Sequence, residues 1–245
     1  MMVFSIAWRE LRNLFLSPLA WCLLAIVQGI LAWLFLFAVQ RFLENPGSVA
    51  GVTDTVAAGL FNIAGFITLP IVSLLSMRLL AEERRNGSLT LLLSAPVRLT
   101  ELVVGKYLGL MGFLGIMAAM LTLMPLSLSL GAHLDYGKLA TQLLGFLLLL
   151  GSFAAVGLFM SGLTRHPIVA AFSSFGLLLF LWIINVFAGL IKSASPLFHY
   201  LSFQDHYQSW LTGTFSSADA LFFLLCIFLF LTLSIRRLDS ARMGA

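Results

Sequence analysis

The sequence predicts an all-α polytopic membrane protein with six transmembrane helices, and two features of its composition support this prediction. Of the 245 residues, 60% are apolar and only 10% carry a formal charge, whereas about 25% of the residues in soluble domains are charged. The charges cluster and leave six uncharged stretches of about 16 to 25 residues, long enough or nearly so to cross a hydrocarbon core. This composition excludes a soluble enzyme, a disulfide-stabilised secreted domain and a nucleic-acid-binding protein.

We treat residues 1–245 as one transmembrane domain with spans at 19–39, 56–77, 107–130, 139–163, 168–191 and 215–235. Six crossings put both termini on one side, and only Arg41, Lys138 and Lys192 among the 14 basic residues fall on the other side. The other basic residues share the side of the termini: Arg9, Arg12, Arg78, Arg84, Arg85, Arg98, Lys106, Arg165, Arg236, Arg237 and Arg242. Because basic residues concentrate in cytoplasmic loops, we predict that both termini, segment 78–106 and tail 236–245 are cytoplasmic.

Residues 1–17 predict an amphipathic helix that lies in the cytoplasmic membrane interface. One face carries apolar side chains, namely Val3, Phe4, Ala7, Trp8, Leu11, Leu14 and Phe15. The other face carries Ser5, Arg9, Glu10, Arg12 and Asn13, which we expect to face water. Ser17-Pro18 marks the turn into the first span, because the residue before proline avoids helical geometry. The alternative is an extension of the first span, which places Arg9, Glu10 and Arg12 unfavourably in hydrocarbon.

The interiors of the spans contain no charged side chain, and the chain shows no catalytic motif. Their deep polar residues are neutral, and Gln28, Asn62 and Asn185 are the candidates for a translocation path. A proton- or ion-coupled carrier, or a channel, normally keeps a charge there, so both are disfavoured. The chain also lacks the phosphate-binding pattern of a P-loop.

The four histidines lack the spacing of a metal site. His199, Asp205 and His206 share one external segment, which we interpret as an ordinary interfacial loop. We therefore predict that this chain binds no metal and no cofactor.

The cytoplasmic segment after the second span predicts a docking element. Glu82, Glu83, Arg84 and Arg85 extend the helix into water as a charged stalk that can pair with a partner protein, and Asn86-Gly87 predicts its end. Ser88 caps a short new helix that runs through Leu93 and is closed by Pro96. Its apolar side suits a groove on the partner and consists of Leu89, Leu92 and Leu93. The alternative is a solvated charge run followed by a helix that lies on lipid.

Residues 81–97, AEERRNGSLTLLLSAPV, and 102–109, LVVGKYLG, resemble the signature of ABC-2 (type-2 ABC exporter) permeases. The start WREL at 8–11 with Ser17-Pro18, and SPLFHY at 195–200 with Phe203, resemble the branch of gliding-motility and nitrous-oxide-reductase-maturation permeases. A departure is Thr90, where relatives often carry Glu. The resemblance covers nearly the whole chain and implies a permease subunit in the bacterial cytoplasmic (inner) membrane.

The resemblance also implies partners. The cytoplasmic element is then a coupling helix that docks on a separate ABC ATPase subunit holding ATP and Mg²⁺, with two ATPases and two permease copies, expected as a homodimer, per exporter. The external segment 192–214 forms short outer-leaflet helices that gate the exit, with His199, Phe203, Tyr207 and Trp210 as gate residues. Relatives often occur with an auxiliary membrane protein that carries an extracytoplasmic domain. The alternative function is therefore an ATPase-coupled anchor that transmits motion to such a protein without moving a solute.

Overall fold

The computed structural model of the chain describes residues 2–44, 51–86, 98–130, 133–190, 198 and 200–243, which form helices and short connections without a strand. Within these ranges six helices are long and apolar enough to cross a membrane. They are α2 (Pro18–Glu44), α3 (Ala58–Arg85) with the π-helical turn η1 (Thr53–Ala57) before it, α5 (Leu99–Ser127), α6 (Tyr136–Leu163), α7 (Pro167–Leu190) and α10 (Ser217–Met243). The predicted fold class, all-helical with six spans, is confirmed.

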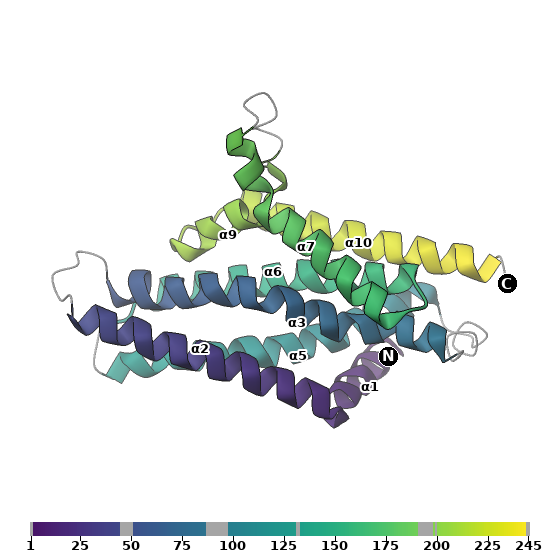
Figure 1. Cartoon of the computed structure of the whole chain (residues 1–245), viewed down its shortest axis with the longest axis horizontal. Helices are drawn as coiled ribbons and strands as arrows, with labels where there is room; N and C mark the ends of the chain where they lie inside the picture. The colour runs from purple at the N-terminus through teal and green to yellow at the C-terminus, as the bar shows by residue number, and fades with distance from the viewer. Residues whose placement is uncertain are drawn as a thin grey trace.

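The spans lie lengthwise in a bundle whose two ends differ (Figure 1). At the end that we name the basic end, α3 finishes, α5 begins, residues 164–166 join α6 to α7, and α10 finishes. The opposite end carries η1, the 3₁₀ turn η2 (Leu128–Leu130), the start of α6 and the short helix α9 (Phe203–Leu211). α6 is the most enclosed span, and α2 and α10 bury the smallest share of their residues, as helices that face lipid or a partner do.

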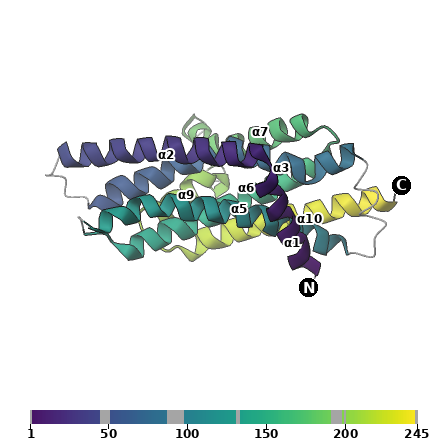
Figure 2. The same cartoon turned by 90° about the horizontal axis from the view of Figure 1, so that it is seen from below.

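The first helix, α1 (Met2–Leu16), runs across the bundle rather than along it and packs on α5 (Figure 2). Glycines on α5 permit this close approach. A Cβ atom on Gly105 would lie 2.7 Å from Ile6 Cγ2, and one on Gly109 would lie 2.6 Å from Glu10 Cβ and 2.9 Å from the Ala7 carbonyl oxygen. The separate first helix agrees with the turn predicted at Ser17-Pro18, and its depth in a membrane stays a prediction.

The expectation that Glu10 faces water is wrong. Glu10 is 9% exposed and lies in the α1–α5 contact, beside Ala7 and Leu14. Two features of α5 explain this position: Gly109 leaves room for the Glu10 side chain to approach, and Lys106, one turn earlier, supplies a cation. The amphipathic pattern predicts a water-facing Glu10 because Glu is a polar residue on the polar side of the helix. Such a pattern does not show whether a buried cation on another helix pairs with it.

Gly109→Ala tests the close contact between α1 and α5. The added methyl group meets backbone and Cβ atoms that cannot give way, so we expect Gly109→Ala to lower the free energy of unfolding by about 1–3 kcal/mol. Gly115→Ala on the same helix is the matched control, because nothing lies within 4 Å of its added Cβ. It should be neutral or stabilising by about 0.5–1 kcal/mol. Thermal unfolding in detergent measures both, and equal melting temperatures would contradict the packing described.

Candidate functional site

A buried ion triad joins three helices at the basic end. Lys106 of α5 is only 1% exposed, and its Nζ atom lies 2.8 Å from Glu10 Oε1 of α1 and 2.7 Å from Glu83 Oε1 of α3. An ammonium group loses its hydration when buried and is tolerated only with hydrogen-bonded counter-ions. Lys106 therefore fixes the position of α1 and of the last turn of α3 relative to α5.

Beside this triad a cleft of about 560 Å³ opens between α1 and the last turns of α3. Charged and polar groups line it, among them Arg9, Asn13, Ser17, Arg78, Glu82 and Asn86. Arg78 Nη1 donates to Ser17 Oγ at 2.9 Å, which ties the α1–α2 turn to α3. The cleft is therefore walled by the helices that the triad holds together.

The predicted coupling helix at 88–93 falls in segment 87–97, outside the described residues, so its residues Gly87, Ser88, Leu89, Leu92 and Leu93 stay predictions. The described chain gives both ends of that segment. α3 ends at Arg85 with Asn86 as its C-cap, where the Asn-Gly pair predicts, and α5 begins after the N-cap Arg98. Both ends belong to helices that Lys106 connects, so a displacement of the segment reaches α3, α5 and α1 together.

The stalk residues occupy different environments. Glu82 and Arg85 are exposed, Arg84 is partly buried, and Glu83 is turned inward to Lys106. Sequence reasoning grouped these four as contacts to a partner and missed the intrachain role of Glu83. The available signal was Lys106 itself: it sits beside Gly105 at the edge of an apolar span, with apolar residues at positions 102, 103, 109 and 110 around it on the helix.

Lys106→Met tests the triad. The substitution leaves two carboxylates buried without their cation, so we expect a loss of about 3–5 kcal/mol in the free energy of unfolding. Lys138→Met is the matched control, because it removes a Lys–Asp pair whose side chains are about one-third exposed, and it should cost much less. Adding Glu83→Gln to Lys106→Met should restore part of the loss. A triad substitution that costs no more than the control would contradict this assignment.

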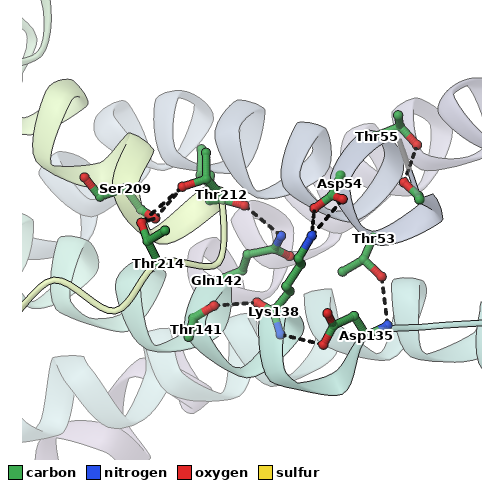
Figure 3. Close-up of polar contacts among 12 residues, drawn as sticks. Thr53, Asp54, Thr55, Asp135, Lys138, Thr141, Gln142, Ser209, Thr212 and Thr214 are labelled. Atoms are coloured by element: carbon green, nitrogen blue, oxygen red, sulfur yellow. Dashed lines mark hydrogen bonds and ion pairs between the residues drawn. The ribbon is translucent and has the colours of Figure 1, made fainter. Parts of the chain in front are cut away.

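A second polar network fastens α9 and the starts of α3 and α6 at the opposite end (Figure 3). Lys138 Nζ contacts both carboxylate oxygens of Asp54 at 2.7 and 2.8 Å, which joins α6 to η1. Asp135 caps α6, and its backbone N–H donates to Thr53 Oγ1 at 3.0 Å. Gln142 Nε2 donates to the Leu211 carbonyl oxygen at 3.0 Å and so binds the end of α9 to α6.

The predicted gate aromatics of α9 are buried against the bundle. Phe203, Tyr207 and Trp210 are each at most 1% exposed. The Tyr207 hydroxyl donates to the Phe61 carbonyl oxygen at 2.9 Å, and burial raises the pKa of this phenol well above its ordinary value, so it stays a donor. The Trp210 indole lies where a side chain on Gly145 of α6 would be. Their gate role stays a prediction, and His199 lies outside the described residues.

His206 on α9 forms a clasp to α10. Its Nδ1 atom lies 2.6 Å from Asp219 Oδ1, its Nε2 atom lies 3.0 Å from the Tyr200 carbonyl oxygen, and its ring stacks on Phe222 with 4.0 Å between centroids. A carbonyl oxygen only accepts, so Nε2 is the donor in the contact to Tyr200. The ring therefore connects Tyr200, ahead of α9, with the start of α10. The adjacent Asp205 is engaged by Asn185 Nδ2 at 2.9 Å.

His206→Ala tests the clasp. The substitution removes the contact to Asp219, the contact to the Tyr200 carbonyl oxygen and the ring that stacks on Phe222, so we expect α9 to open more often. Amide hydrogen exchange in α9 should therefore become faster at constant pH. His133→Ala, at a histidine outside the described residues, is the control and should leave this exchange unchanged. Protection of α9 that stays the same in His206→Ala would contradict the clasp.

The three polar residues predicted to line a translocation path have different contacts. Gln28 Nε2 donates to the Met117 carbonyl oxygen at 2.9 Å and joins α2 to α5, and Asn185 Nδ2 donates to Asp205 Oδ1. Asn62 lines a cleft of about 480 Å³ together with Gln208 and Thr212 at the opposite end. Among the described residues, no group of three His, Cys, Asp or Glu side chains could hold a metal ion.

In the described part of the chain, six apolar helices, a helix packed across one end and three short helical elements at the other define a helical multi-pass membrane protein. The family model described as ABC-2 family transporter protein matches residues 4–243, nearly the whole chain. The chain therefore belongs to the ABC-2 transporter family and is a membrane component, a permease, of an ABC transporter. In that family ATP hydrolysis typically belongs to a separate subunit. Comparison with curated proteins finds no match.

Proposed function

We propose that this chain is the membrane-spanning subunit of an ATP-driven ABC-2 exporter that docks a separate ABC ATPase at its basic end. Two copies, as a homodimer, form the translocation path at their interface and bind two ATPase subunits, which hold ATP and Mg²⁺. The basic end and both termini then face the cytoplasm of a bacterial cell, and the chain lies in its inner membrane. The polar residues Gln28, Asn62 and Asn185 serve the path, and the helices between α7 and α10 gate its outer end.

The Lys106 triad is the observation that carries this proposal. A coupling element transmits motion only if the helices that it pushes are rigidly connected, because packed interfaces switch between discrete arrangements rather than deform continuously. Segment 87–97 leaves α3 and enters α5 at the triad, where Lys106 ties both helices to α1. Closure of the ATPases on ATP would therefore move three helices as one body. A nearly complete switch needs roughly 5.5 kcal/mol of differential binding, which ATP binding can supply.

Replacing the predicted coupling helix tests the docking. We expect the tagged chain to co-purify with an ATPase from native membranes, and a Gly/Ser replacement of residues 88–93 to abolish this association. A Gly/Ser replacement of residues 46–50, which stand between α2 and η1 in the sequence, is the matched control and should retain the ATPase. Retention of the ATPase by the 88–93 variant would contradict docking through this helix.

Transport is measured separately in membrane vesicles. Export that requires ATP and the co-purified ATPase supports the proposal, and so does its loss in the 88–93 variant at normal membrane abundance. ATPase activity that depends on an auxiliary protein with an extracytoplasmic domain, without solute movement, would instead identify an ATPase-coupled anchor. Solute flux in vesicles that lack any ATPase would identify a carrier or channel.

A further inference from the structure

Three arginines from separate parts of the chain converge at the basic end. Ser161 near the end of α6 sets the register of α6 against α3: its Oγ accepts from the backbone N–H groups of Leu80 and Ala81 at 3.1 and 2.9 Å. α3 and α6 run in the same direction at this point, from the opposite end toward the basic end. Arg84 lies about one helical turn beyond Leu80, and Arg165 lies four residues beyond Ser161, so the two arginines come out at similar height.

The third arginine comes from α10. The rings of Phe159 on α6 and Phe230 on α10 are in contact, with 5.7 Å between centroids, and α10 runs parallel to α6. Arg165 lies six residues beyond Phe159 and Arg237 seven residues beyond Phe230, which again gives similar heights. Arg84 is close enough to both Arg165 and Arg237 to be repelled by each of them.

Within the described residues, no side-chain carboxylate pairs with this cluster. In the described part, no Asp or Glu oxygen lies within 4 Å of Arg84, Arg165 or Arg237. The residues outside the described ranges contain no Asp or Glu in their sequence. Three like charges that meet without a counter-ion destabilise the fold, and an external anion that binds between them relieves this repulsion.

The surroundings of the cluster are those of a membrane interface. Residues 164–166 lead directly into α7, where Ile168 and Phe172 are 69% and 73% exposed. α10 also exposes large apolar side chains along its length, such as Phe228. An anion that binds here with its charge on the arginines can place hydrocarbon against these side chains. A headgroup phosphate with attached acyl chains meets both requirements.

We propose that Arg84, Arg165 and Arg237 form a binding site for the phosphate headgroup of an anionic phospholipid. The lipid bridges α3, the 164–166 connection and α10, three parts of the chain that share no ion pair among the described residues. The site binds phosphatidylglycerol-type headgroups through charge-assisted hydrogen bonds from guanidinium groups, which suit phosphate oxygens geometrically. The inference needs only membrane insertion and does not depend on an ATPase partner.

The test uses the purified full chain and compares dioleoyl phosphatidylglycerol with dioleoyl phosphatidylcholine. Native mass spectrometry measures the bound lipid, and the melting temperature of the chain is measured before and after lipid is added. We expect phosphatidylglycerol to bind and stabilise, and phosphatidylcholine to do neither. Each Arg→Gln substitution in the cluster should weaken phosphatidylglycerol binding by about fivefold, from roughly 1 kcal/mol per basic residue at an anionic surface. The triple variant Arg84→Gln, Arg165→Gln, Arg237→Gln should weaken it on the order of 100-fold.

Two controls separate the site from general charge and from misfolding. Arg12→Gln removes an exposed arginine of α1, away from the cluster, and should bind phosphatidylglycerol as the unchanged chain does. A triple Arg→Lys variant of the cluster keeps the charge and should retain most of the binding, which shows that a substituted cluster still folds.

Four outcomes would overturn the proposal. The triple Gln variant could bind phosphatidylglycerol unchanged, or phosphatidylcholine could bind equally well. Glycerol 3-phosphate alone could reproduce the stabilisation, which would identify a site for a free phosphate. If the triple Gln variant bound lipid unchanged but lost a co-purifying protein, the cluster would instead be a binding site for an acidic protein surface.

Discussion

The burial of the Lys106 ammonium group is the constraint on which the basic end depends. A buried cation requires its counter-ions in fixed places, so Glu10 and Glu83 must both come to α5, and their helices come with them. Gly105 and Gly109 make this approach possible by leaving room for α1. The charge of Lys106 and the two glycines depend on each other. Without the glycines Glu10 could not reach the cation. Without the cation, α1 would place a carboxylate in an apolar contact.

The opposite end is held in another way. There, hydrogen bonds and partly exposed ion pairs connect η1, α6 and α9, while the side chains of Phe203, Tyr207 and Trp210 on α9 are buried against the bundle. Partly exposed pairs contribute little to stability individually, so α9 depends on packing and on the His206 clasp to α10. The basic end is thus tied together by a buried ion triad, and the opposite end is attached by weaker contacts. In the exporter that we propose, this distribution gives firm connections at the end that docks the ATPase and weaker ones at the end that opens.

Sequence reasoning predicted the features that composition and periodicity determine. Six spans follow from uncharged stretches, the separate first helix follows from Ser17-Pro18, and the end of α3 follows from Asn86-Gly87. It did not predict the partners of Glu10 and Glu83, because an ion pair between residues 96 or 23 positions apart depends on which helices become neighbours. The same limit explains why it could not predict the different surroundings of Gln28, Asn62 and Asn185, which are alike in type.

The basic residues at one end of the bundle therefore serve physically different purposes, although topology rules count them alike. Lys106 is enclosed and paired with two carboxylates inside the chain, and Arg78 donates a hydrogen bond to the uncharged hydroxyl of Ser17. Arg84, Arg165 and Arg237 have no carboxylate from this chain within ion-pair distance in its described part. The protein buries Lys106 and provides two glutamates for it. The three arginines of the cluster are balanced by anions from outside the chain, so the anionic lipids of the membrane become part of what holds the basic end together.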